Sequence, residues 1–381
     1  MHDCLIRIIV ACLLYSGLAP LDAIAGNRTF SGQRAIMDGD IGLWTSPKEI
    51  DQRLQRIKDA GFTVYMPAVW YGRGTTWPSR YAPWDFTLNT QSFVERDPLR
   101  YAIEKAHQLG LEVHPWFTLA LRWNEGFMPE YALEGVTEGP HAAFDVHSSA
   151  FRRFMAHIVS EVVANYDVDG VNLDYGRAMG VCRSAGCQVE YRALYNRSLT
   201  ADALLFRISP TKVPSLIEYQ ENAVTAMIRM ISNSVRAIKS RVLISADGHP
   251  ELARYEQGQN TIDWLNKGLI DVILRMDYHP HIDHVATETV RGKITNPDAL
   301  TLLISNMAHG ADLPTGELPY SRSGEWLSST MATISNQWPN TGVAVYFYKY
   351  LSEEQIAALK RGASSRVKNG TAPAAPLLGI Q

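Results

Sequence analysis

The chain has 381 residues, of which 46% are hydrophobic and 20% charged, and its formal net charge is −3. This is ordinary globular composition, with enough apolar residues for a large core. The 39 acidic residues outnumber the 36 basic ones and the basic residues form no run, so we expect no nucleic-acid partner.

The first 25 residues have the pattern of a secretory signal peptide. Arg7 precedes an apolar core at residues 8–15, and Ala23-Ile24-Ala25 forms an A-x-A cleavage site before Gly26. The apolar core is too short for a stable membrane span, and no later segment approaches that length. We therefore expect a signal peptide at residues 1–25 and a periplasmic or extracellular mature protein, with no membrane span after the signal is removed.

Two cysteines, Cys182 and Cys187, remain after signal removal. A close pair in an oxidising compartment predicts a disulfide, and two free thiols are the alternative. Zinc is not expected here, because a lone cysteine pair with this spacing supplies too few ligands without a nearby histidine. We expect neither a metal nor another cofactor.

Strand-like and helical segments alternate along the mature chain, as in a parallel sheet with helical crossovers. Ser46 and Glu49 form a capping box at the start of the first helix, and Ser352 and Gln355 form another near the end of the chain. The predicted strands cover residues 34–37, 63–70, 112–119, 170–175, 242–247, 271–278, 300–306 and 343–348. Further helices are expected around 99–106, 151–163, 217–238 and 326–334. Long loops should follow the second and third strands, and an irregular stretch should run from Cys187 to Pro214.

This alternation predicts a (β/α)8 TIM barrel, an α/β fold, as a single domain over residues 26–363. Residues 364–381, rich in Ala, Pro and Gly, are expected to form a disordered tail. An open doubly wound sheet is the rival fold. It usually carries a Gly-rich nucleotide-binding loop after its first strand, and this sequence has none.

Aspartates recur at the carboxyl ends of three predicted strands, where a β/α barrel places catalytic groups. Asp174 ends the fourth strand, Asp247 the fifth and Asp277 the sixth, and the alternation of side chains predicts that all three point inward. Glycoside hydrolysis needs two carboxyl groups, one protonated and one ionised. We expect Asp174 to be catalytic, Asp277 to be its partner and Asp247 to be the next candidate. Structural ion pairs with Arg177 or Arg275 are the alternative.

Aromatic residues suggest a sugar-binding groove, because sugar rings stack on aromatic planes. Six of the nine tryptophans precede residue 124, several of them in the loops expected after the second and third strands. The candidates are Trp70, Trp77, Trp84, Trp116 and Trp123, with core packing as the alternative for some of them. The other expected substrate contacts are Arg73, His114, Arg177, Tyr278 and His279. His279, His281 and His284 could instead bind a metal.

Several motifs resemble the bacterial glycosyl-hydrolase-like family 10. They lie at residues 61–70, 77–79, 97–99, 110–117, 166–174 and 276–280, and they follow the family's order over most of the mature chain. The resemblance implies a (β/α)8 glycosidase linked to bacterial cell-surface polysaccharides. The family's fourth-strand aspartate motif falls on Asp174.

Residues 169–176, DGVNLDYG, are also similar to the fourth-strand signature of the chitinase-like family 18, D-G-x-D-x-D-x-E. Asn172 replaces one aspartate of that signature, and Gly176 stands where its catalytic glutamate would be. Chemistry of that type therefore lacks its acid here.

The sequence thus predicts an exported glycoside hydrolase that acts on a bacterial polysaccharide or surface glycan by carboxylate catalysis. Two other functions are kept as alternatives. One is a catalytically silent carbohydrate-binding barrel in polysaccharide export, and the other is a metal-dependent hydrolase or deacetylase that uses the histidine cluster.

Overall fold

The computed structural model describes residues 29–368 except 41–43, 89–96, 124, 138–141, 252–256 and 309–317. The expected signal peptide lies outside the described residues. Helix α12 (Glu353–Lys368) continues into the expected tail, and the rest of that tail lies outside the described residues.

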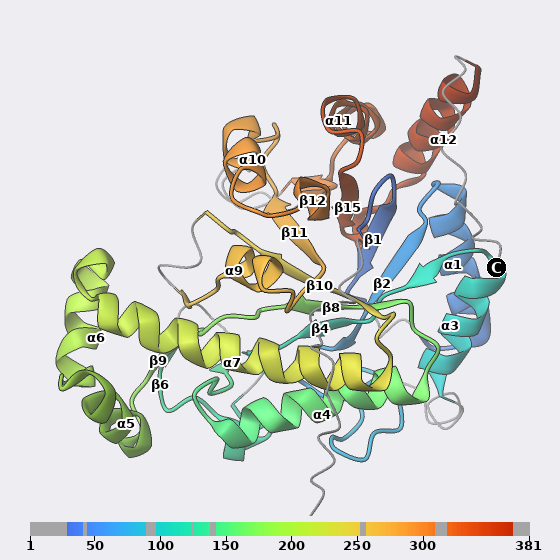
Figure 1. Ribbon diagram of the computed structural model, residues 1–381. Helices are drawn as coiled ribbons and strands as arrows, with labels where there is room; N and C mark the ends of the chain where they lie inside the picture. The colour runs from blue at the N-terminus through green and yellow to red at the C-terminus, as the bar shows by residue number, and fades with distance from the viewer. Residues whose placement is uncertain are drawn as a thin grey trace, which may run out of the picture.

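Eight parallel strands form a closed barrel, which confirms the predicted fold class (Figure 1). Strand β1 pairs with both β2 and β15, and this double pairing closes the sheet. In barrel order the strands are β1 (Arg34–Asp38), β2 (Val64–Trp70), β4 (Trp116–Thr118), β8 (Gly170–Asp174), β10 (Leu243–Gly248), β11 (Val272–Asp277), β12 (Leu300–Ser305) and β15 (Gly342–Tyr346). The predicted third strand is interrupted between β3 (Glu112–Val113) and β4, where Pro115 has no N–H group for the ladder.

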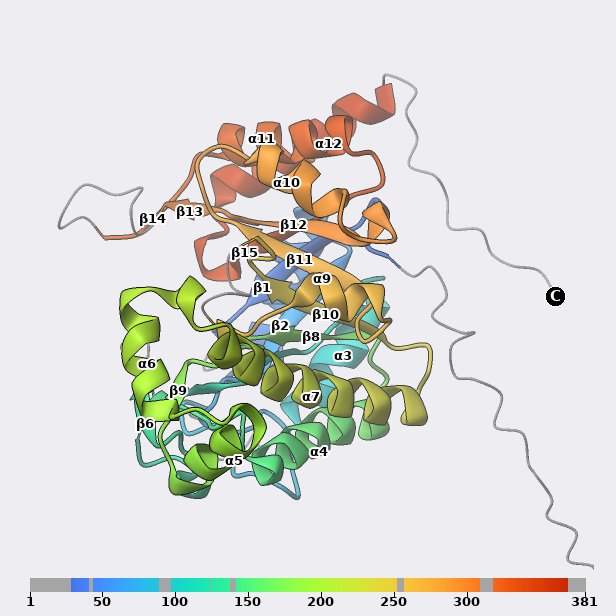
Figure 2. The ribbon, with the colours of Figure 1, turned by 60° about the vertical axis from the view of Figure 1, so that its left-hand side comes forward.

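Helices surround the barrel on its outer face (Figure 2). They are α1 (Pro47–Asp59), α3 (Pro98–Gln108), α4 (Ser149–Asn165), α7 (Pro214–Ile238), α9 (Thr261–Asn266), α10 (His284–Arg291), α11 (Gly324–Gln337) and α12. Helix α1 begins as predicted, with the Ser46 side chain accepting a hydrogen bond from the Glu49 N–H. Within the described residues, every helix falls short of the length or hydropathy required to cross a membrane.

The stretch expected to be irregular before Pro214 contains two helices, so that expectation was wrong. The connection from β8 to Pro214 comprises β9 (Gly180–Cys182), α5 (Ala185–Tyr195), α6 (Leu199–Ile208) and the 3-10 turn Pro210–Lys212. These elements have a small core of their own, which includes Cys182, Cys187 and Tyr191. Their helical pattern is hard to recognise because large apolar residues, such as Val189 and Ile208, remain exposed on the opposite faces.

The remaining elements are short. They are β5 (Leu121–Arg122), β6 (Gly135–Thr137), β7 (Ala142–Ala143), β13 (Met307–Ala308), β14 (Tyr320–Ser321) and the 3-10 turns Pro129–Tyr131, Pro297–Ala299 and Tyr348–Tyr350. Strand β6 pairs with β9, which ties the loop after β4 to the connection after β8.

Apolar side chains form two main layers. The inner core fills the barrel and includes Met37, Met66, Leu243, Leu274 and Leu303. The outer core lies between the strands and the helices. Because strand residues alternate between these layers, membership of one or the other shows which way a neighbouring polar side chain points.

Candidate active site

Strand β8 places Asp174 inside the barrel. Val171 and Leu173 are buried in the outer core, whereas Asn172 lies in register with Trp116 of the inner core. Asp174 shares the face of Asn172, so its predicted inward orientation is confirmed. Its carboxyl group lies at the carboxyl end of the strand, where β/α barrels carry catalytic residues.

Hydrogen-bond donors surround the Asp174 carboxyl group. The Trp116 Nε1–H donates to Oδ2 over 3.2 Å, and the Tyr175 backbone N–H donates to Oδ1 over 2.6 Å. Burial raises the pKa of Asp174, whereas the nearby Arg177 charge and these two donors lower it. Burial has the larger effect, so the pKa of Asp174 is raised, and Arg177 and the two donors limit that rise by stabilising the ionised form.

Asp247 lies beside Asp174, on the neighbouring strand β10. It shares the inner face with Leu243 and accepts a hydrogen bond from Asn172 Nδ2 over 2.7 Å. Burial, followed by the negative charge of Asp174, raises the pKa of Asp247 well above its ordinary value. The two carboxyl groups therefore differ in environment, and Asp247 is the one that holds a proton more strongly.

Asp277 points away from the barrel interior, so its predicted role as the partner of Asp174 was wrong. On strand β11, Val272 and Leu274 belong to the inner core and Ile273 to the outer core. Asp277 shares the face of Ile273 and lies in register with Ile304, another outer-core residue. The prediction failed because the barrel interior is itself apolar at this strand.

The Asp277 carboxylate has a structural role in the outer layer. Arg275 Nη1 donates to its Oδ2 over 2.7 Å, and the Asp283 backbone N–H donates to the same oxygen over 2.9 Å. Arg275 also contacts Glu251 at 3.0 Å. This buried network joins β11 to the start of α10, and it matches the ion-pair alternative considered for this residue.

Four tyrosines surround the acids, each at or just beyond the carboxyl end of a strand. Tyr71 follows β2, Tyr175 follows β8, Tyr278 follows β11 and Tyr346 ends β15. The Tyr71 ring lies 5.6 Å from Trp116, and the Tyr278 and Tyr346 rings stack at 5.5 Å. Burial raises the pKa of all four hydroxyls, which keeps them as neutral donors. Only Tyr278 was predicted. A tyrosine at the last or next position of a strand is the signal that would have indicated the others.

The sequence matches a known family, whose description agrees with this barrel fold. The family model described as glycosyl hydrolase-like 10 matches residues 37–304, more than half of the chain. The chain belongs to this family. Glycosyl hydrolase DigH of Escherichia coli (strain K12) is 24% identical over 255 residues, covering 57% of this chain and 54% of DigH, and DigH of Shigella flexneri matches equally. The chain thus spans about half the length of the curated relatives it matches.

Solved structures share the barrel fold. The glycoside hydrolase domain of PgaB (BpsB) from Bordetella bronchiseptica superimposes with a TM-score of 0.63 at 11% identity, covering 88% of this chain and 97% of that domain. The α-L-fucosidase isoenzyme 2 from Paenibacillus thiaminolyticus gives 0.59 at 14% identity, covering 88% of this chain and 49% of the other. The chain thus shares the TIM-barrel fold of these glycosidases and belongs to a family described as glycosyl hydrolase-like.

Two of the tryptophans that were predicted to bind sugar pack in the outer core of this glycosyl hydrolase-like protein. Trp70 and Trp77 are fully buried, and the Trp77 Nε1–H donates to Glu161 Oε2 over 2.9 Å. Neither ring presents a face to a substrate, so both predictions were wrong. Trp116 is mostly buried but contacts Asp174 directly. Trp84 and Trp123 keep exposed surface, and their expected sugar contacts stay predictions.

His114 lies at the opposite end of the barrel from the acids. It is fully buried, with its ring 5.1 Å from Phe30 and its Nε2 3.1 Å from Glu112. A Cβ atom at Gly170, the first residue of β8, would lie only 2.2 Å from His114 Nδ1. His114 therefore packs at the amino end of the barrel, and its predicted contact with substrate was wrong.

Three other predicted contacts lie at the carboxyl ends of the strands. Arg73 pairs with Asp85 at 2.7 Å, and its guanidinium lies over the Tyr71 ring at 5.1 Å. Arg177 lies 4.5 Å over the Tyr175 ring, and its charge lowers the pKa of both acids. His279 is exposed on the loop after β11. Their roles in substrate binding stay predictions.

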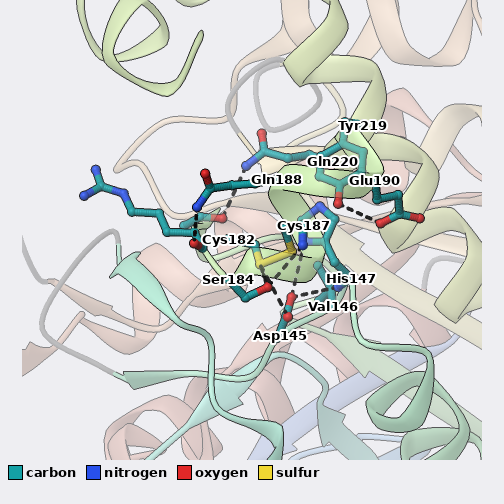
Figure 3. The surroundings of a disulfide bond; sticks show 12 residues. Asp145, Val146, His147, Cys182, Ser184, Cys187, Gln188, Glu190, Tyr219 and Gln220 are labelled. Carbon is teal, nitrogen blue, oxygen red and sulfur yellow. Dashed lines mark hydrogen bonds and ion pairs between the residues drawn. A yellow bond between two sulfur atoms is a disulfide. The ribbon is translucent and has the colours of Figure 1, made fainter. Parts of the chain in front are cut away.

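The predicted disulfide between Cys182 and Cys187 is present, with an S–S distance of 2.03 Å (Figure 3). It joins β9 to the first turn of α5, in the connection that begins at Asp174. The three histidines at 279, 281 and 284 do not gather into a possible metal site among the described residues. The group that does so is Asp145, His147 and the two disulfide cysteines.

Gly176 faces away from the acids. A Cβ atom at this position would lie 3.5 Å from Ile228 and 3.6 Å from Trp264, both of which belong to the outer core. Residue 176 therefore differs from the family 18 signature in two ways. It carries no carboxylate, and a side chain at this position would point away from the acids.

Proposed function

We propose that this chain is an exported glycosidase that hydrolyses O-glycosyl bonds in a bacterial polysaccharide or surface glycan, with Asp174 and Asp247 as its two catalytic carboxyl groups. One observation carries the proposal. Two buried carboxyl groups lie on adjacent strands at the carboxyl end of the barrel, and the pKa of Asp247 is raised further than that of Asp174, so that Asp174 ionises first. That difference is what glycoside hydrolysis requires.

Asp247 serves as the general acid. Its raised pKa keeps a proton available for the oxygen of the leaving sugar. Asp174 acts in its ionised form, either as the nucleophile at the anomeric carbon or as the base that activates a water molecule. Trp116, Arg177 and the Tyr175 N–H stabilise that negative charge. If Asp174 is the nucleophile, water hydrolyses the glycosyl-enzyme and gives its proton to Asp247. If Asp174 is the base, it takes the proton of the attacking water, and exchange with solvent then returns a proton to Asp247 and removes one from Asp174.

The tyrosines support a carbohydrate substrate. Tyr71, Tyr175, Tyr278 and Tyr346 are partly buried aromatic rings with neutral hydroxyls, so they offer both stacking surfaces and hydrogen-bond donors. The secretory pattern of residues 1–25 supports export, and an exported glycosidase of this family would meet glycans outside the cytoplasm.

A reducing-end assay on a panel of bacterial polysaccharides tests the proposal. The wild-type protein should release new reducing ends from at least one polysaccharide, and Asp174→Asn should lower turnover by ~10²–10⁴-fold while leaving glycan binding intact. Asp169→Asn is the matched control, because Asp169 lies just before the same strand at the other end of the barrel. Retained turnover in Asp174→Asn would overturn the assignment. Binding without any new reducing ends would favour a carbohydrate-binding barrel.

A further inference from the structure

Four potential metal ligands, including the two disulfide cysteines, lie together in one cluster. Asp145, His147, Cys182 and Cys187 each offer one ligand atom, and these atoms all lie within 4.8 Å of one another (Figure 3). The first two precede α4, and the cysteines come from β9 and α5. The sequence argued against zinc because no histidine was close to the cysteine pair. The fold supplies one from an earlier loop.

The cluster is enclosed and rich in lone pairs. Cys182, Cys187 and His147 are buried, and the His147 ring stacks on Tyr219 with centroids 4.4 Å apart. Asp145 Oδ2 lies 3.6 Å from Cys182 Sγ, and Asp145 Oδ1 lies 3.3 Å from His147 Nδ1. A disulfide sulfur carries no hydrogen, so the first contact joins two electron-rich atoms without a donor. A cation at this point would satisfy both.

We propose that reduction of the Cys182–Cys187 disulfide converts this cluster into a Zn²⁺ site. Two thiolates, one imidazole and one carboxylate are ligands that zinc accepts in tetrahedral geometry, at about 2.0–2.3 Å from the metal. Ligand atoms already within 4.8 Å of one another need to move by only about 1 Å to reach such a geometry. The disulfide and the zinc use the same two sulfurs and therefore exclude each other.

The chemistry balances with a dithiol reductant. The dithiol gives two electrons and two protons to the disulfide and becomes a disulfide itself, leaving Cys182 and Cys187 as thiols. Zinc then binds the thiolates and releases both protons to solvent. Arg152 lies beside the cluster, where its Nη1 donates to the carbonyl oxygens of Val146 and His147 at 2.9 Å. Its positive charge interacts with the negative charge of Asp145 and so offsets part of the negative charge of the ligands.

Either state fastens the same part of the molecule. The disulfide links β9 to α5, and zinc would link both to the loop before α4. The connection that begins at the proposed catalytic Asp174 would therefore stay anchored when the cysteines are reduced. This inference does not depend on the proposed glycosidase function, because its readouts are metal binding and stability.

Zinc titration of the full chain in both redox states tests the proposal. Every protein tested carries the substitutions Cys4→Ser and Cys12→Ser, so that thiol titration reports only Cys182 and Cys187. The protein is reduced with a phosphine, or reduced in denaturant and refolded, until two thiols are counted. Zn²⁺ binding is then measured by calorimetry. Co²⁺ provides a second readout, because its absorption reports tetrahedral thiolate ligation.

The reduced protein should bind one Zn²⁺ per chain with an increase in melting temperature, and the disulfide form should not bind at this site. His147→Ala should weaken zinc binding to the reduced protein by at least about tenfold, the loss that even an outer partner of a metal site causes. His281→Ala, an exposed histidine on another loop, is the matched control. Equal zinc binding by the disulfide form, unchanged affinity in His147→Ala, or no zinc binding by the reduced protein would each overturn the proposal.

Discussion

Asn172 donates its side-chain amide to Asp247 Oδ1 over 2.7 Å and to Ser245 Oγ over 3.1 Å. This contact joins the strand of Asp174 to the strand of the proposed acid, and it lowers the pKa of Asp247 against the larger effect of burial. The amide therefore helps to set the pH range over which Asp247 keeps its proton.

Replacing Asn172 by leucine should move the alkaline limb of kcat/KM to higher pH. The substitution removes a donor that favours ionised Asp247, so the pKa of this acid rises further and its protonated form persists to higher pH. Ser245→Ala is the control, since it spares the contact between Asn172 and Asp247. The pH dependence of kcat/KM checks the prediction, and an unmoved or lowered alkaline limb in Asn172→Leu would contradict it.

The two proposed catalytic acids should respond differently to the leaving group. Asp247→Asn should lose ~10²–10⁴-fold in kcat/KM on a natural glycan, because its leaving oxygen needs a proton. On an aryl glycoside with an acidic phenol that loss in kcat/KM should largely disappear, whereas Asp174→Asn should stay impaired on both substrates. Comparison of kcat/KM for the two variants on the two substrates is the measurement. The opposite pattern would exchange the two roles.

Asp247→Asn should also stabilise the fold at neutral pH. The pKa of Asp247 lies near its ordinary 3.8 in the unfolded chain and well above that in the folded protein. Between these two values the unfolded chain binds fewer protons, so the stability of the wild-type protein falls as pH rises through this window. The Asp247→Asn variant has no ionisable group at this position, so its stability does not fall in this way. Urea unfolding at several pH values should show a stability difference that grows with pH, and a constant difference would argue against the raised pKa.

Asp277→Asn should reduce stability but not catalysis. The substitution removes one of the two charged partners of buried Arg275, which still forms its ion pair with Glu251. We therefore expect a loss of roughly 1–3 kcal/mol in the free energy of unfolding. Since Asp277 points out of the barrel, kcat per folded molecule should stay within about twofold, well short of the ~10²-fold minimum for losing an acid–base group. Denaturant unfolding and kcat would be measured on the same preparation. A large fall in kcat would restore Asp277 to the catalytic pair.

Two tryptophan-to-phenylalanine variants should separate packing from catalysis. Trp116→Phe removes a donor to Asp174, so the pKa of Asp174 should rise and the acidic limb of kcat/KM should move to higher pH. Trp77→Phe removes a donor to buried Glu161 and should cost roughly 1–3 kcal/mol of stability without moving that limb. If Trp77→Phe changed substrate binding instead, the original sugar-contact prediction would regain support.

The barrel was predictable because its strands and helix caps are marked locally. The alternation in β8 is clear, with Val171 and Leu173 opposite Asn172 and Asp174, and the Ser46 cap forms as expected. The orientation of Asp247 followed from the same rule. Sequence alternation assigns two faces to a strand, and here the outward face happened to be the more apolar one.

The same rule failed where both faces of a strand are buried. Val272 and Leu274 fill the barrel, so the apolar face of β11 is its inner one and Asp277 lies outside. In β2 every residue is buried, and nothing in its sequence separates Trp70 in the outer core from a residue in the site. Resolving these cases requires the pairing of distant strands, which a local pattern does not contain.

The path of the chain after Asp174 also limits how this site could change. Tyr175 has a φ of 48°, in the left-handed region, and the next residue, Gly176, then faces Ile228 and Trp264. A glutamate at residue 176 would bury its carboxylate against apolar side chains rather than approach the acids, at a large desolvation cost. A single substitution therefore would not convert this site to family 18 chemistry. The whole connection to the anchored Cys182 would have to follow a different path.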